Sequence, residues 1–146
     1  MNPSAPQNFP PLTLTIMRAL CSLSAVYPSY PEYQSKLVSC LDVLFHEFWV
    51  NHTEIHKPEI LTEILKKVLG EEEKERILGM VGKEGKEVLN KNTKKAIEEG
   101  AFGLPWMVCE DGEGRKESFW GVDHLGQVRE FLSLGGERRG GWKAVL

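Results

Sequence analysis

Two histidines, His52 and His56, stand four residues apart, a spacing that can place two metal ligands on one side of a helix. The residues between them do not complete the HExxH pattern of a zinc protease, and no third ligand is evident nearby. The three cysteines, Cys21, Cys40 and Cys109, are spaced too widely for a CxxC motif. We therefore predict no metal site, and we expect buried, reduced thiols.

Patterns typical of nucleophilic or phosphate chemistry are also missing from the sequence. It contains no GxSxG, no P-loop and no GxGxxG. His124 falls in the first turn of the last predicted helix, where it could contact a ligand or be an ordinary solvated side chain. The catalytic residues thus stay unassigned at this level.

Composition describes a soluble protein with weak overall charge. The chain has 146 residues, of which 41% are hydrophobic and 27% charged, and its net charge is -3. Such a balance provides no broad positive field, so we expect neither a nucleic acid nor a membrane as partner. The apolar run at 12–26 is short and interrupted by Arg18, and we expect it to form a buried amphipathic helix.

Helical periodicity dominates the first two thirds of the chain. Apolar residues recur every three or four positions, which predicts helices at 12–27, 31–50, 58–68 and 86–99, and another that begins at Glu71. In the second of these, Val38, Phe45 and Trp49 widen an already continuous apolar stripe. So broad a stripe predicts burial on more than one side, at the centre of the core. The mixed charges of 57–99 are typical of solvated helix faces.

The pattern changes at Gly100. Residues 106–110 and 115–120 are typical of two strands joined by a turn at 111–114, and helical spacing returns at 122–134. The sequence therefore predicts an α+β fold of about five helices followed by a strand–strand–helix unit. A hairpin with one helix is too small to be stable alone, so it needs further packing partners.

The segment Gly100-Ala-Phe-Gly-Leu-Pro-Trp106 comes directly before the first strand. Proline at this point cannot donate a hydrogen bond to a sheet, and the residue before it is held extended. A cis Leu104–Pro105 bond would turn the chain sharply and expose the main chain of Leu104, although the pattern alone does not predict the cis form.

On these residues the chain resembles the kappa class of glutathione transferases, relatives of DsbA and of the 2-hydroxychromene-2-carboxylate isomerases. The resemblance lies in the Gly100–Trp106 segment, in Phe119-Trp-Gly-Val-Asp-His-Leu125 and in the helix containing Asn92-Thr93. Weaker similarity covers most of residues 10–134. It implies a DsbA-type helical insertion domain followed by the C-terminal β-β-α half of a thioredoxin fold. The corresponding boundaries are an irregular arm at 1–11, a helical domain at 12–99, the partial thioredoxin-like unit at 100–134 and a tail at 135–146.

The resemblance also implies half of a glutathione-binding site. Leu104, followed by the cis-proline Pro105, would hydrogen-bond the cysteinyl part of glutathione through its main chain. Val122 and Asp123 occupy the family's strand-end pair, commonly Ser-Asp, which holds the γ-glutamyl end. The carboxylate is kept, whereas Val122 loses a hydroxyl contact. Glutathione would act as co-substrate toward a small electrophile.

The resemblance further implies a strand and a helix that carries the catalytic serine, ahead of everything in this sequence. No residue of 1–11 fits those roles, so we expect an N-terminally truncated relative. Two interpretations follow. Either the chain conjugates or isomerises a small electrophile with another thiolate donor, such as Ser118, His124 or a partner's residue, or it is an inactive homologue that dimerises or binds partners through an exposed strand. We expect an intracellular homodimer, in the cytoplasm, mitochondria or peroxisomes.

Overall fold

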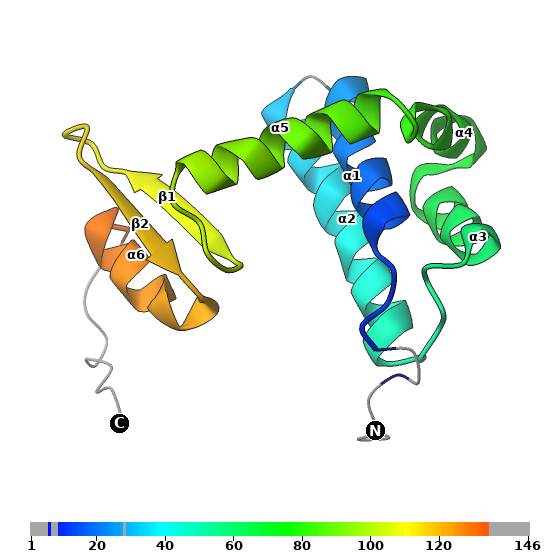
Figure 1. Ribbon diagram of the computed structural model, residues 1–146, viewed down its shortest axis with the longest axis horizontal. Helices are drawn as coiled ribbons and strands as arrows, with labels where there is room; N and C mark the ends of the chain where they lie inside the picture. Colours follow the sequence, from blue (N-terminus) through cyan, green and yellow to red (C-terminus); the bar gives the residue numbers. More distant parts are fainter. Residues whose placement is uncertain (1–5, 7–8, 28, 135–146) are drawn as a thin grey trace. The chain divides into compact units, whose positions relative to one another are not determined.

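The computed structural model describes residues 6, 9–27 and 29–134, and the predicted tail at 135–146 and most of the predicted arm lie outside these residues. The chain divides into two compact units, residues 1–92 and 93–146, with the division inside a helix. Figure 1 shows the elements of both units. No helix of the described residues is long and apolar enough to cross a membrane.

The elements follow the order that the periodicity predicts. They are α1 (Leu14–Val26), α2 (Tyr30–Trp49), α3 (Pro58–Leu69), α4 (Glu71–Met80), α5 (Glu84–Glu98), β1 (Trp106–Glu110), β2 (Lys116–Trp120), the 3-10 turn η1 (Val122–His124) and α6 (Leu125–Phe131). The last predicted helix is shorter than expected, because Ser133 adopts a positive φ of 51° just after α6.

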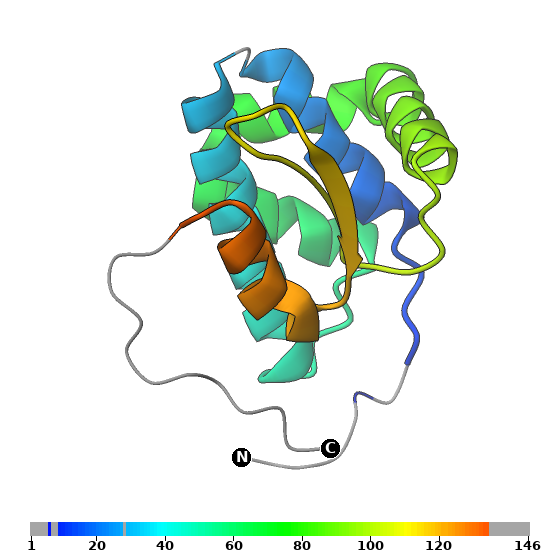
Figure 2. The ribbon, with the colours of Figure 1, turned by 90° about the vertical axis from the view of Figure 1, so that its left-hand side faces the viewer.

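The core of the first unit lies among α1, α2, α3 and α4. Helix α1 packs against α2 and α4, and α3 packs against the same two helices. Both views show α1 beside α2 (Figures 1 and 2). The most deeply buried side chains come from all four of these helices and are Ala19, Ser22, Leu23, Cys40, Leu61, Leu65 and Ile77. As expected, the cysteine thiols are free, with Cys40 and Cys109 buried and Cys21 partly buried.

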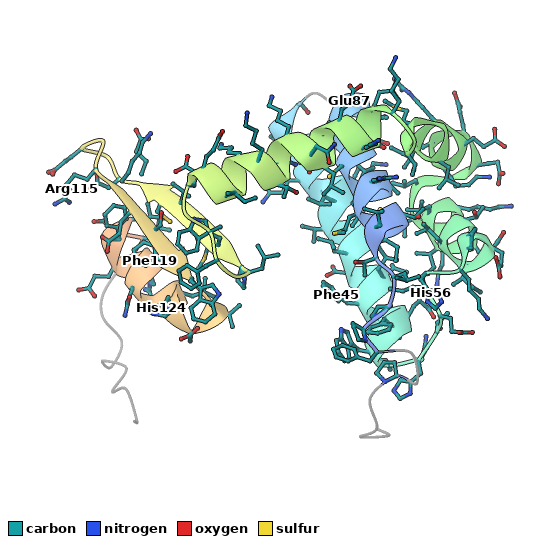
Figure 3. All side chains as sticks on the ribbon, in the orientation of Figure 1. Phe45, His56, Glu87, Arg115, Phe119 and His124 are labelled. Atoms are coloured by element: carbon teal, nitrogen blue, oxygen red, sulfur yellow. The ribbon has the colours of Figure 1, made fainter. Side chains whose placement is uncertain are left out.

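Burial of α2 is narrower than the sequence predicts. Cys40, Leu44 and Phe48 form a buried stripe at four-residue spacing. Val38, Phe45 and Trp49, however, are all about half exposed, so the expectation that this helix is buried on more than one side is wrong for the structure described. Figure 3 labels Phe45 on this helix. Phe45 is 57% exposed, because the elements of the first unit that pack on α2 cover one side of it.

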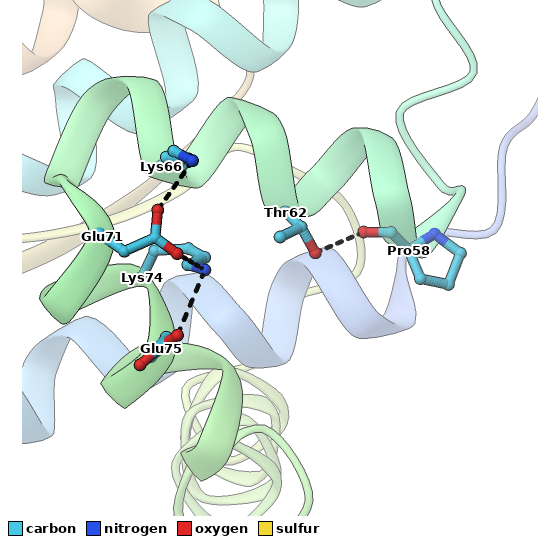
Figure 4. Close-up of polar contacts among 6 residues, drawn as sticks. All are labelled: Pro58, Thr62, Lys66, Glu71, Lys74 and Glu75. Atoms are coloured by element: carbon cyan, nitrogen blue, oxygen red, sulfur yellow. Dashed lines mark hydrogen bonds and ion pairs between the residues drawn. The ribbon is translucent and has the colours of Figure 1, made fainter.

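A charged network closes the turn between α3 and α4. Gly70 adopts a φ of +89°, which a side chain would resist, and this ends α3. Glu71 then accepts ion pairs from Lys66, at 2.9 Å, and from Lys74 (Figure 4). Because Lys74 is 7% exposed, its charge needs this carboxylate.

In the second unit β1 and β2 form an antiparallel hairpin in which Trp106 pairs with Trp120 and Glu110 with Lys116. Cys109 and Phe119 are buried on one face, where the Phe119 ring meets Phe131 of α6 at 5.8 Å between centroids. Helix α6 lies along this face of the hairpin (Figure 1). The hairpin thus buries one face against its own helix.

The outer edge of β1 carries free main-chain groups. Hydrogen bonds run from Asp111 N–H to Arg115 O and from Gly121 N–H to Pro105 O, each 3.0 Å long. Because paired and unpaired positions alternate in an antiparallel ladder, the main-chain groups of Trp106, Val108 and Glu110 point away from β2. No other strand of the described residues pairs with this edge.

Candidate functional site

The predicted site residues meet at the open end of the hairpin. The Leu104–Pro105 bond is cis, as the resemblance implied. The Gly121 N–H donates to the Pro105 carbonyl at 3.0 Å, which ties the loop before β1 to the end of β2. Leu104 and Val122 are the next residues along these two segments. Both side chains face solvent, with exposed fractions of 84% and 67%.

The main chain of Leu104 is available to a ligand. No described residue hydrogen-bonds its N–H or its carbonyl oxygen. A residue with both groups free can pair with a peptide bond as a residue of a neighbouring strand would. The loop therefore offers one donor and one acceptor to an extended, peptide-like ligand.

Asp123 provides the negative charge of this site. Its carboxylate is 78% exposed and folds back over Gly121, where a Cβ atom would lie 2.3 Å from Asp123 Oδ1. Gly121 also has a φ of +87°, a backbone conformation that favours glycine. Asp123 Oδ2 lies 3.3 Å from His124 Nδ1, at ion-pair distance when the imidazole is protonated. An exposed carboxylate so placed can bind a ligand's ammonium group.

Three aromatic rings hold the loop in place. The Phe102 ring lies 5.2 Å from the Trp106 ring and 5.1 Å from the Trp120 ring, measured between centroids. Since Trp106 and Trp120 are cross-strand partners, Phe102 packs across both strands at once. These contacts pack the segment just before Leu104 against both strands.

The structure separates the two candidate thiolate donors. His124 adjoins Asp123 at the end of the hairpin, whereas Ser118 pairs with Val108 in its middle. Figure 3 shows His124 at the end of the hairpin opposite Arg115, which marks the turn. Of the two, His124 therefore lies in the candidate site.

The predicted absence of a metal site rests on His52 and His56, and the structure shows where they lie. His52 follows α2 with a φ of +54°, and His56 precedes α3. Among the described residues no three histidine, cysteine or carboxylate side chains gather as metal ligands would.

Two features were not predicted from the sequence. One is the packing of Gly103 under Trp120, which depends on the fold of the loop. The other is a cavity of about 310 Å³ between α2 and α3, bordered by Glu47, Glu63 and Lys67. The sequence does contain a signal for this cavity, because Glu63 and Lys67 are four residues apart and so lie on one side of a helix. Such charges are equally typical of a solvated helix face, which is how they are interpreted from the sequence.

Comparison with known families agrees with this fold. The family model of the DSBA-like thioredoxin domain matches residues 22–133, most of the chain. The chain therefore belongs to the family of DSBA-like thioredoxin domains. Among curated proteins it is similar to glutathione S-transferase kappa 2 of Caenorhabditis elegans, with 33% identity over 91 residues. That alignment covers 62% of this chain and 40% of the relative, so the chain matches less than half of the relative's length.

Proposed function

We propose that the chain binds glutathione at the end of the hairpin. The observation that carries this proposal is the juxtaposition of the free Leu104 main chain with the exposed Asp123 carboxylate, across the hydrogen bond between Gly121 and Pro105. The similarity to a kappa-class glutathione transferase supports the choice of ligand.

The chemistry of glutathione suits these groups one by one. Its cysteinyl residue has an amide N–H and a carbonyl oxygen, which can pair with the carbonyl and N–H of Leu104. Its γ-glutamyl end carries an ammonium group, which Asp123 can bind by a charge-assisted hydrogen bond. Pro105 holds Leu104 in place, and Val122 contributes an apolar contact beside Asp123.

The proposal includes the domain boundaries that the resemblance implies. A helical insertion domain spans residues 12–99, and a half thioredoxin unit spans residues 100–134.

The enzymatic form of the proposal is conjugation or isomerisation of a small electrophile by bound glutathione. The glutathione thiol must lose its proton before its sulfur attacks an electrophilic carbon, so the reaction needs a group that stabilises the thiolate. His124 is the described side chain next to the site that could serve, once the ligand is bound.

Calorimetric titration with reduced glutathione tests the binding proposal. We expect measurable binding by the wild-type protein and a loss of about tenfold or more in affinity for Asp123→Asn, because a charged partner of the ammonium is removed. Glu117→Gln is the matched control, since Glu117 is an exposed carboxylate within β2. An equal loss in both variants, or no binding at millimolar glutathione, would refute the proposal.

A second candidate function is that of an inactive homologue that assembles through β1. The outward main-chain groups of Trp106, Val108 and Glu110 favour it, because such an edge can accept another strand. In this form a second copy of the chain would pair with β1 and produce a homodimer.

A further inference from the structure

We propose that the cavity between α2 and α3 binds a small apolar amino acid as a free zwitterion. This inference is independent of the glutathione proposal, since all the residues involved belong to the first unit. It rests on the volume of the cavity, on the residues that line it and on their charges.

Part of the lining of the cavity, which is open to solvent, is apolar. Val43 of α2 and Ile60 and Ile64 of α3 line it, and the volume is about 310 Å³. That volume is at the lower end of the range for small-molecule sites, so the cavity suits a ligand with one aliphatic side chain.

One carboxylate of the lining, that of Glu47, is fixed in position by hydrogen bonds. Glu47 Oε2 accepts hydrogen bonds from Asn51 Nδ2 at 3.0 Å and from Thr53 Oγ1 at 2.9 Å. These bonds lower the pKa of Glu47, and the bond from Asn51 has the larger effect and the bond from Thr53 the smaller one. The Glu47 carboxyl group is therefore charged at neutral pH. Both bonds use Oε2, which leaves Oε1 for a donor from outside.

Two further charges of the lining have no ion-pair partner in the described part of the chain. They are Glu63 and Lys67, both of which line the cavity, and neither forms an ion pair with a described residue. Lys67 lies close enough to Glu47 to influence its pKa. The lining thus contains two carboxylates that could bind an ammonium group and one ammonium that could bind a carboxylate, together with apolar side chains. An amino acid such as leucine has the matching charges and an aliphatic body.

Titration of the isotope-labelled full chain with L-leucine, followed by NMR, tests this inference. We expect chemical-shift changes at the cavity residues, with Glu63→Gln and Lys67→Met each weakening the affinity by about tenfold. Glu59→Gln and Lys91→Met are the controls, because both residues are exposed and do not line the cavity. Glu47 is left unchanged, since its hydrogen bonds also stabilise the end of α2.

Two leucine derivatives test the contributions of the ligand's ammonium and carboxylate groups to binding one at a time. N-acetyl-leucine lacks the ammonium and leucinamide lacks the carboxylate, so we expect both to bind at least about tenfold more weakly than leucine. Leucinamide binding as tightly as leucine would overturn the inference in favour of a peptide N-terminus. Absence of shifts at millimolar leucine, or affinities of the two cavity variants equal to those of the controls, would also overturn it.

Discussion

Gly103 lies directly against the indole of Trp120, so that a Cβ atom on Gly103 would be 2.3 Å from Trp120 Nε1. This contact joins the loop before β1 to the last residue of β2. The loop carries Leu104, and β2 leads into Asp123. The two halves of the proposed glutathione site are therefore held together partly by the absence of a side chain at residue 103.

We predict that Gly103→Ala displaces the Trp120 indole and weakens glutathione binding by several-fold. The added methyl group overlaps with the indole ring, which is half exposed and can rotate away. The indole N–H resonance of Trp120 should shift, as NMR would show. Gly112→Ala is the control, since a Cβ there meets nothing within 4 Å. An unchanged Trp120 resonance in Gly103→Ala would contradict the contact.

The first unit contains a second glycine contact. We predict that Gly85→Ala lowers the free energy of unfolding by about 1–3 kcal/mol, since its Cβ would lie 2.4 Å from the Arg18 carbonyl oxygen and 2.5 Å from Ser22 Oγ. The backbone of α1 cannot move aside as a side chain can.

Gly79→Ala in α4 is the matched control for Gly85→Ala. The added methyl group meets nothing within 4 Å there, and the variant should gain about 0.5–1 kcal/mol through helix propensity. Urea unfolding of the two variants checks both values. If the two substitutions changed stability equally, the close approach of α1 and α5 would be wrong.

If the chain is an inactive homologue that assembles through β1, we expect a dimer formed by pairing of that strand. Val108→Lys should convert that dimer to a monomer, because it places a charge on the face of β1 next to the pairing edge. Sedimentation of wild type and variant measures the change, with Glu117→Lys on β2 as a control for added charge. A wild-type monomer, or a dimer that Val108→Lys leaves intact, counts against assembly through β1.

Glu47 should make stability depend on pH. Its pKa lies below the ordinary value of 4.5 because Asn51 and Thr53 hydrogen-bond to the charged form. A lowered pKa stabilises the folded state above 4.5, and this contribution is lost as the pH falls through the lowered value. Glu47→Gln should therefore cost about 0.5–1 kcal/mol at neutral pH and progressively less as the pH falls below 4.5.

Urea unfolding across this pH range, with Glu59→Gln as control, measures the effect of Glu47. The difference in stability between wild type and Glu47→Gln should shrink on acidification. A difference that stays constant from neutral pH to below 4.5 would show that the hydrogen bonds to Glu47 do not favour its charged form.

The sequence predicted the elements better than their packing. Apolar spacing placed α1 to α5 within a few residues, because helical periodicity reflects which face is buried. Strand-type residues on either side of the turn at 111–114 placed β1 and β2. Exposure of Phe45 and Trp49 could not be predicted, since it depends on which elements lie beside α2. The resemblance at Gly100–Trp106 pointed to Leu104 and the one at 119–125 pointed to Asp123, but only the fold shows the Gly121–Pro105 hydrogen bond that ties these two segments to each other.

The most direct test of the account is an NMR titration of the full chain with reduced glutathione. The account predicts that the amide resonances of Leu104, Val122 and Asp123 shift together and saturate, while those around Glu47 and Lys67 respond separately if at all. Shifts confined to the α2–α3 cavity, or none at millimolar glutathione, would contradict the central claim that the end of the hairpin binds this ligand.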